Sequence, residues 1–163
     1  MLYSSWLYTK RMGWVTKSKP KGCIFCRIAK GDKRVPSRIL YRGKKTMVIM
    51  NLFPYNTGHL EVIPIRHVKD LSELTEEELQ DLWRRIVKSM RLLRRVLKPQ
   101  GFNVGINIGE LAGASVEHLH VHIVPRFRRD FGFMEVTGET RVMPESIDET
   151  FDKLKQHVKL LED

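Results

Sequence analysis

Three histidines at every second position, His118, His120 and His122, constrain the fold more than any other feature of this chain. Side chains of a β-strand point alternately to its two faces, so this spacing predicts a strand over residues 117–125 with the imidazoles on one face and apolar side chains on the other. At a rise of about 3.3 Å per residue, His118 and His122 would lie roughly 13 Å apart, which is too far for both to ligate one metal ion. We therefore expect the three histidines to have different roles.

Three kinds of chemistry compete for this row: a metal site that uses two of the histidines, a histidine nucleophile, and a merely structural role. Strict alternation, with Asn107, Gly113 and Ser115 shortly before the row, favours a chemical role over a structural one. Imidazole titrates near pH 7, so a neutral ring can attack phosphorus while a neighbouring ring holds phosphate oxygens or assists the leaving group.

The two cysteines, Cys23 and Cys26, are too close in sequence to form a long-range disulfide. Their spacing fits a metal or redox role in a reducing compartment.

The chain has no apolar run of the roughly 18–20 residues that a membrane span needs, and no signal-peptide pattern. We expect a cytoplasmic protein without a membrane partner.

Positive charge is concentrated in the first part of the chain. Residues 1–50 contain 13 Lys and Arg residues and one acid, Asp32, whereas the remainder carries a small acidic excess. A basic segment attracts the phosphates of nucleotides and of nucleic acids alike, and a solvated lysine-rich surface has the same composition. The length of 163 residues suits one core, and we expect a basic, aromatic arm over residues 1–22 and a single domain over residues 23–163.

Hydrophobic periodicity predicts an α+β fold. A short helix and four further strands are expected over residues 24–30, 37–41, 46–51, 59–65 and 102–108. Capping boxes start two helices, at Thr75 and at Ser146; apolar residues at helical spacing continue the first to the stop at Pro99 and the second to Leu161. Residues 126–144 are expected to be irregular.

The long helix carries seven basic residues that are expected on its exposed face: Arg84, Arg85, Lys88, Arg91, Arg94, Arg95 and Lys98. Such a row could bind nucleic acid as a ridge, but it more often forms an ordinary solvated face, and we favour the second interpretation.

The segment His118–Val124 resembles the signature of the histidine triad (HIT) family, in which histidines alternate with hydrophobic residues. The resemblance extends over residues 22–127, where further segments stand in the family's order: Cys23–Cys26, Asn51–His59, Pro64–His67 and Gly105–Asn107. It implies a HIT-like α+β fold, which is a five-stranded antiparallel sheet with one long central helix and a C-terminal helix, and it implies a homodimer.

The resemblance also assigns roles to individual residues. It implies that His120 attacks the α-phosphate of a nucleotide and forms a covalent nucleotidyl intermediate, and that His122 contacts the phosphate. The substrate-binding residues that it implies are Asn51 at the ribose hydroxyls, Asn107 and Ser115 at the phosphate oxygens, and Gly113 in the lining loop. It implies a structural zinc ion held by Cys23, Cys26, His67 and His118; a free dithiol without metal and a redox pair are the alternatives.

Beyond the histidines, residues 125–134 and 140–145 resemble dinucleoside polyphosphate phosphorylases and hydrolases, which cleave diadenosine tetraphosphate. Those enzymes usually carry Gly-Asp-x-Asn-Phe-Met, whereas this chain has Gly132 in place of the asparagine, so the acceptor that releases the nucleotide, water or phosphate, stays open. The expected function is cleavage of dinucleoside polyphosphates. The alternatives are a nucleoside phosphoramidate hydrolase and a nucleotide-binding or nucleic-acid-binding regulator; nucleic acid is not the favoured partner.

Overall fold

The computed structural model describes residues 21–128, 130, 132–138 and 143–162. The expected arm over residues 1–22 therefore lies almost entirely outside the described residues. As predicted, the fold is α+β and contains a five-stranded antiparallel sheet with strand order β1-β2-β3-β5-β4. The strands are β1 (Ile39–Arg42), β2 (Thr46–Met50), β3 (Leu60–Pro64), β4 (Gly101–Ile106) and β5 (Val121–Arg126).

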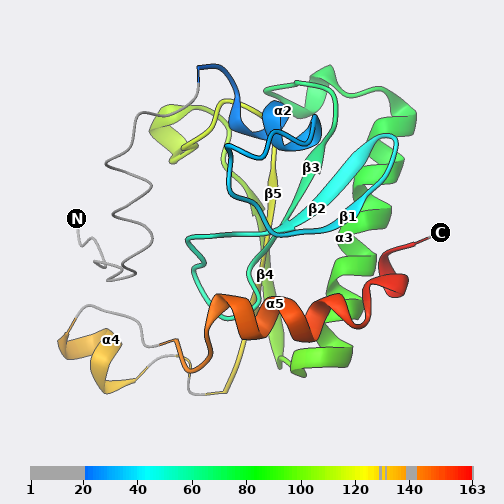
Figure 1. Cartoon of the computed structure of the whole chain (residues 1–163). Helices are drawn as coiled ribbons and strands as arrows, with labels where there is room; N and C mark the ends of the chain where they lie inside the picture. The colour runs from blue at the N-terminus through cyan, green and yellow to red at the C-terminus, as the bar shows by residue number, and fades with distance from the viewer. Residues whose placement is uncertain (1–20, 129, 131, 139–142, 163) are drawn as a thin grey trace.

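The long helix α3 (Glu76–Leu97) covers one face of the sheet (Figure 1). It begins as predicted, because the Thr75 hydroxyl accepts from the Glu78 backbone N–H and the Glu78 carboxylate accepts from the Thr75 N–H. Its apolar stripe packs against alternate residues of the strands. The main core formed in this way includes Leu60, Val62, Val121 and Ile123 from the sheet and Leu82, Ile86, Leu92 and Leu93 from the helix.

A smaller core lies on the other face of the sheet. Its members include Phe25 and Ile28 from α2 (Ile24–Ala29), together with Met47, Ile49 and Ile63 from β2 and β3. Both central strands are thus buried on their two faces, and every residue of β2 and β3 is buried. A polar side chain on these strands therefore needs a specific partner.

The strand that carries the histidines is shorter than predicted. β5 begins at Val121, so only His122 belongs to it, and His118 and His120 lie in the extended segment before it. The Leu119 backbone N–H donates to the Val68 carbonyl at 2.7 Å, so this segment is bonded to the connection after β3 instead of the sheet ladder. The predicted burial still holds, because Leu119, Val121 and Ile123 are all buried on the side opposite the histidines.

Three other sequence predictions need correction. The C-terminal helix starts at the predicted capping box, but α5 (Ile147–Lys155) ends early and a separate 3₁₀ turn, η3 (Val158–Leu161), follows. The segment 126–144, expected to be irregular, contains a short helix, α4 (Phe133–Thr137). Arg85, expected on the exposed face of α3, is buried under the C-terminal segment.

Two further 3₁₀ turns are η1 (Leu71–Glu73) and η2 (Glu110–Ala112). No helix in the described ranges is long and apolar enough to cross a membrane.

Candidate active site and metal site

Four side chains from three separate parts of the chain meet at one point: Cys23, Cys26, His67 and His118. The Sγ atom of Cys23 lies 3.2 Å from Nδ1 of His118, and Sγ of Cys26 lies 3.3 Å from Nδ1 of His67. All four ligand atoms lie within 4.8 Å of one another. Zinc holds thiolate sulfur at about 2.3 Å and imidazole nitrogen at about 2.0–2.1 Å in a tetrahedron, so its ligand atoms lie roughly 3.3–3.8 Å apart. The donors and their spacing fit zinc.

Backbone bonding directs the lone pair of His118 into this cluster. Its Nε2 lies 3.0 Å from the carbonyl oxygen of Pro64, and because a carbonyl only accepts, Nε2 carries the proton. The other nitrogen, Nδ1, is then free to bind a metal, which is the usual arrangement of a metal-ligating histidine. Burial lowers the pKa of His118 to about 4, so the ring is neutral at pH 7.

His120 is oriented in the opposite sense. Its Nδ1 donates to the backbone carbonyl of His118 at 2.8 Å, which leaves the lone pair of the neutral ring on Nε2. The ring is buried and its edge contacts Phe25, with ring centroids 5.2 Å apart. Burial lowers the pKa of His120, so the ring is held in the neutral form that a nucleophile requires.

His122 stands next to His120, with ring centroids 4.7 Å apart, and has a second histidine on its other side. Nδ1 of His122 lies 3.0 Å from Nε2 of His59. The backbone N–H of Tyr55 donates to Nδ1 of His59 at 3.1 Å, so the neutral His59 ring carries its proton on Nε2 and donates to His122. The proton of a neutral His122 therefore sits on Nε2.

Both of these rings are neutral at pH 7. The pKa of His59 is lowered to about 3, mainly by burial and in addition by the neighbouring rings of His122 and His120. Burial likewise lowers the pKa of His122 to about 4, with repulsion from His120 as the second cause. The site thus presents one nitrogen lone pair, on His120, beside one N–H donor, on His122.

The turn that carries His59 is fixed from two directions. Gly58 has φ of +81°, which favours glycine, and a Cβ at this position would displace the end of the Leu97 side chain. The Asn56 amide donates to the Pro125 carbonyl at 3.0 Å and to the Asp130 carboxylate at 2.8 Å. These bonds hold the turn against the end of β5, next to the histidines.

Asn51, the predicted ribose-binding residue, lies at the end of β2 and is held by two partners. Its amide nitrogen donates to Oε1 of Glu61 at 2.7 Å, and its carbonyl oxygen accepts from the Phe53 N–H at 2.7 Å. Glu61 is buried, and this burial raises the pKa of its carboxyl group to about 8. Oε1 of Glu61 also lies 3.6 Å from Nδ1 of His122.

The loop after β4 contains the three other predicted phosphate-side residues, Asn107, Gly113 and Ser115. Gly113 has φ of +90°, and a Cβ there would lie 3.8 Å from the Asn107 amide nitrogen, which places these two residues side by side. Ser115 is exposed two residues further on. The phosphate contacts of Asn107 and Ser115, and the place of Gly113 in the lining loop, stay predictions.

The HIT domain profile matches residues 32–129, which is more than half of the chain. The chain belongs to the HIT family. This assignment agrees with the position of the histidines and with the five-stranded antiparallel sheet.

Among proteins similar to this HIT chain, the AP-4-A phosphorylase of Mycobacterium tuberculosis is 43% identical over 113 residues, which cover 69% of the chain and 58% of that protein. The asymmetrical bis(5'-nucleosyl)-tetraphosphatase of Schizosaccharomyces pombe is 41% identical over 97 residues, which cover 60% of the chain and 53% of that protein. The chain therefore spans somewhat over half the length of each of these relatives.

A solved structure gives the same picture of the fold. The crystal structure of a Zn-bound histidine triad family protein from Mycobacterium smegmatis is 30% identical, with a TM-score of 0.67, and the match covers 86% of this chain and 96% of that chain.

The sequence-based prediction gave no role to two residues of the site, His59 and Glu61. His59 closes a turn after Gly58, and the signal for it was a lone histidine directly before an apolar strand. The signal for Glu61 was a single acid inside that strand, Leu60–Pro64. Each was readable as a polar residue among apolar ones, but neither pattern names a partner.

Proposed function

We propose that this HIT protein cleaves dinucleoside polyphosphates of the diadenosine tetraphosphate type by transferring a nucleotidyl group to His120. The observation that carries the proposal is the opposite orientation of the two neighbouring rings. His120 presents a lone pair on Nε2, fixed by its bond to the His118 carbonyl, and His122 presents an N–H. A nucleophile beside a hydrogen-bond donor is the arrangement that phosphoryl transfer requires.

In the first step, the Nε2 lone pair of His120 attacks the α-phosphorus. The bond from phosphorus to the bridging oxygen breaks, and its electron pair leaves with the nucleoside polyphosphate. The Nε2–H of His122 donates to a phosphate oxygen, and Asn107 and Ser115 are proposed to do the same. In the second step an acceptor oxygen, of water or of phosphate, attacks the phosphorus. The electron pair of the broken N–P bond returns to Nε2 of His120, and the proton of the acceptor passes to solvent.

The names of the two relatives support this substrate class, since one is a phosphorylase of AP-4-A and the other an asymmetrical tetraphosphatase. The test is to incubate the protein with diadenosine tetraphosphate, with and without orthophosphate, and to identify the products. ADP and ATP formed only with phosphate mean a phosphorylase, and AMP and ATP mean a hydrolase. No cleavage under either condition rejects the proposal.

We also propose that Cys23, Cys26, His67 and His118 hold a structural zinc ion, supported by the convergence of their ligand atoms. Such an ion would join the start of α2 to the segment before β5, and its role would be in folding. His118 would then be withdrawn from catalysis, which leaves His120 and His122 for the chemistry. Metal analysis of the purified protein tests this, and a stoichiometry near zero rejects it.

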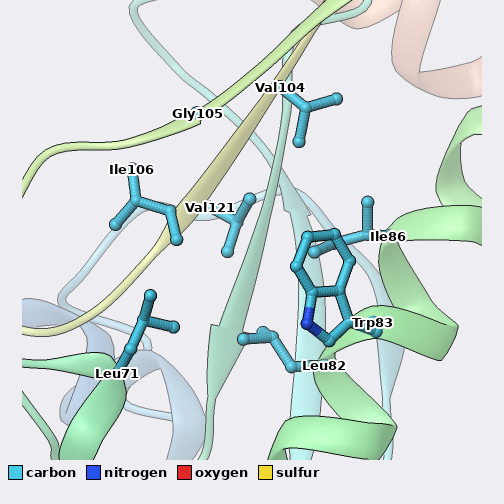
Figure 2. A pocket seen from close by; sticks show the side chains of 8 residues that line it. All are labelled: Leu71, Leu82, Trp83, Ile86, Val104, Gly105, Ile106 and Val121. Atoms are coloured by element: carbon cyan, nitrogen blue, oxygen red, sulfur yellow. The ribbon is translucent and has the colours of Figure 1, made fainter.

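We further propose a homodimer that forms along β4, which is an edge strand of the sheet. An apolar groove runs between this strand and α3; Figure 2 shows Trp83 and Ile86 of the helix on one side and Val104 of the strand on the other. Trp83 is 56% exposed and Val104 is 40% exposed, beside an edge that no second strand pairs in the part of the chain that the structure describes. A second copy of the chain would cover both.

Nucleic acid remains the less favoured partner, because several basic side chains of the described segment are already paired. Arg27 and Arg34 both contact Asp32, and Arg38 contacts Asp148. On α3, the burial of Arg85 interrupts the basic row.

A further inference from the structure

Glu61 is an acid on the strand β3, Leu60–Pro64, of which all five residues are buried. A polar group in such a position is costly unless it is hydrogen-bonded. Oε1 of Glu61 accepts from the amide nitrogen of Asn51 at 2.7 Å, and the described residues give the Glu61 side chain no second hydrogen bond. Its distance of 3.6 Å from Nδ1 of His122 is too long for one. The bond to Asn51 therefore accounts for an acid at this place.

Two hydrogen bonds fix the orientation of the Asn51 amide. The backbone N–H of Phe53 can only donate, so the atom that it contacts at 2.7 Å is the amide oxygen, Oδ1. The amide nitrogen then faces Glu61, which accepts from it. Without an acceptor at position 61, the amide would keep only the bond to Phe53, and a single bond does not hold a side chain against rotation.

Glu61 and His59 are two residues apart, so both point to the same face of the sheet. The backbone N–H of Asn51 donates to the His59 carbonyl at 3.0 Å, which ties the end of β2 to the start of β3. The His59 ring is bonded to His122, and the Glu61 carboxyl is bonded to Asn51. Two buried polar side chains thus stand behind two residues of the proposed site, one each.

The bonds that Asn51 already makes decide what else it can bind. The residue is partly exposed, whereas Glu61 behind it is buried. A side-chain amide has two N–H groups and two lone pairs on its oxygen; Glu61 takes one N–H and Phe53 takes one lone pair. One donor and one acceptor remain. A phosphate oxygen only accepts and would face the free lone pair, whereas hydroxyl groups can both accept and donate. The remaining groups of Asn51 therefore suit the two hydroxyls of a ribose.

We propose that Glu61 is a positioning residue that acts through Asn51 and makes the site selective for ribonucleotides. The inference rests on the proposed nucleotidyl transfer to His120. Glu61 holds the Asn51 amide in the orientation in which its free N–H and free lone pair contact the ribose hydroxyls of the transferred nucleotide. An amide that is held in advance loses no rotational freedom when the substrate binds, so its two hydrogen bonds contribute fully.

The test compares diadenosine tetraphosphate with the analogue that lacks the 2'- and 3'-hydroxyls of both riboses. We expect the wild-type protein to prefer the ribose substrate on the order of 100-fold in kcat/KM, because two hydrogen bonds of about tenfold each are lost with the analogue. Glu61→Leu should reduce this preference to less than about tenfold. The loss should fall on the ribose substrate, and kcat/KM for the analogue should change less than about threefold.

Glu61→Gln is the matched control, because its amide oxygen can still accept from Asn51. Burial raises the pKa of Glu61 to about 8, so the acid is neutral at pH 7 and glutamine has nearly the same shape and charge. We expect Glu61→Gln to keep the ribose preference within about threefold of the wild type. Ile63→Val, on the same face of β3, controls for a loosened strand and should keep the preference as well.

A double-mutant cycle tests whether Glu61 acts through Asn51. Glu61→Leu should lower kcat/KM for diadenosine tetraphosphate about tenfold or more in the wild-type background, but less than about threefold when Asn51 is already replaced by alanine. A full loss in the Asn51→Ala background would mean that Glu61 acts on something else, and it would overturn the inference.

Thermal unfolding establishes that each variant is folded. Glu61→Met, which has a similar length but no acceptor oxygen, replaces Glu61→Leu if that variant does not fold. The inference is overturned if the apolar variant keeps the ribose preference, if it loses activity equally on both substrates, or if Glu61→Gln loses the preference too. A wild-type protein that cleaves both dinucleotides equally well overturns the inference and leaves the proposed function intact, whereas a wild-type protein that cleaves neither overturns both.

Discussion

A backbone group sets the tautomer of each histidine in the row, directly or through a neighbouring ring. The Pro64 carbonyl turns the lone pair of His118 toward the cysteines, and the His118 carbonyl turns that of His120 away from its own chain. The Tyr55 N–H acts on His122 indirectly, because it fixes the proton of His59. Three chemically identical side chains thereby differ in where they carry the proton and the lone pair, as the proposed roles of metal ligand, nucleophile and donor need.

Sequence spacing predicted that the histidines would differ, and the structure brings the four predicted metal ligands together. The sequence could not give the tautomers of the histidines, because these depend on backbone carbonyl and N–H groups that only the folded chain places next to the rings. Glu61 was missed for a related reason. A single acid in an apolar strand is visible in the sequence, but its neighbours, Asn51 directly after β2 and His122 on β5, are far from it in the sequence.

Replacement of His120 by alanine should abolish cleavage, with kcat lowered at least about 1000-fold, because no other lone pair is oriented in the site. Binding of the substrate should change little, since the phosphate-side groups remain. Steady-state kinetics and calorimetric titration measure the two quantities. His157→Ala, which changes a histidine of the C-terminal segment, is the matched control, and activity retained by His120→Ala would refute its role as nucleophile.

Glu61 should also make stability depend on pH. Its pKa of about 8 in the folded protein lies above the ordinary value of 4.5, so the folded state holds the proton more tightly than the unfolded state between these two values. The free energy of unfolding therefore falls as pH rises through this window, by up to about 1.4 kcal/mol per pH unit. Glu61→Gln removes this term.

Urea unfolding of the wild-type protein and of Glu61→Gln between about pH 5 and pH 8 measures the difference. The variant should gain stability relative to the wild type as pH increases, while the contributions of the histidines cancel in the comparison. A difference that does not change with pH would contradict the raised pKa.

Among the helices and strands, the sequence predicted correctly those boundaries that are set by residues close together in the chain. The capping boxes at Thr75 and Ser146 start α3 and α5 as expected, since both use bonds between residues three apart. The sequence did not predict features that depend on contacts between distant segments. The Leu119 N–H donates to the Val68 carbonyl, so β5 begins later than predicted. Arg85 is buried, donates to the Leu161 carbonyl, and lies over the Tyr41 ring with its guanidinium carbon 4.2 Å from the ring centroid.

The proposed metal site would join elements that are far apart in the sequence. Cys23 caps α2 and Cys26 lies in its first turn, whereas His67 and His118 belong to the segments after β3 and before β5. A chelator should therefore lower Tm by at least about 5 °C and loosen α2 first, because metal binding adds to the free energy of folding. Hydrogen exchange of the α2 amides measures the second effect.

Cys26→Ser should show the lower Tm without a chelator and respond little to one. His157→Ala, outside the cluster, should keep the chelator response of the wild type. A wild-type Tm that is unchanged by chelation would count against zinc as a structural element.

For the whole molecule, the open side of the sheet is the feature that the single chain leaves unexplained. Among the described residues, strand β4 pairs only with β5, and the groove beside it is lined by two exposed apolar side chains, Trp83 of α3 and Val104 of β4. Pairing of this edge with a second copy around a two-fold axis would continue the sheet and cover these side chains. Each substitution in such an interface acts twice, because the same residue is present on both sides.

Val104→Glu should therefore convert the proposed dimer to a monomer, with its dissociation constant raised at least about 100-fold, because two carboxylates would be placed in one apolar interface. Light scattering during size-exclusion chromatography measures the mass. Leu160→Glu, which changes an exposed apolar residue on η3, should leave the dimer intact. A wild-type protein that stays monomeric at all concentrations, or a Val104→Glu protein that stays dimeric, would show that β4 is not the contact, and the exposed groove beside Trp83 would then need another partner.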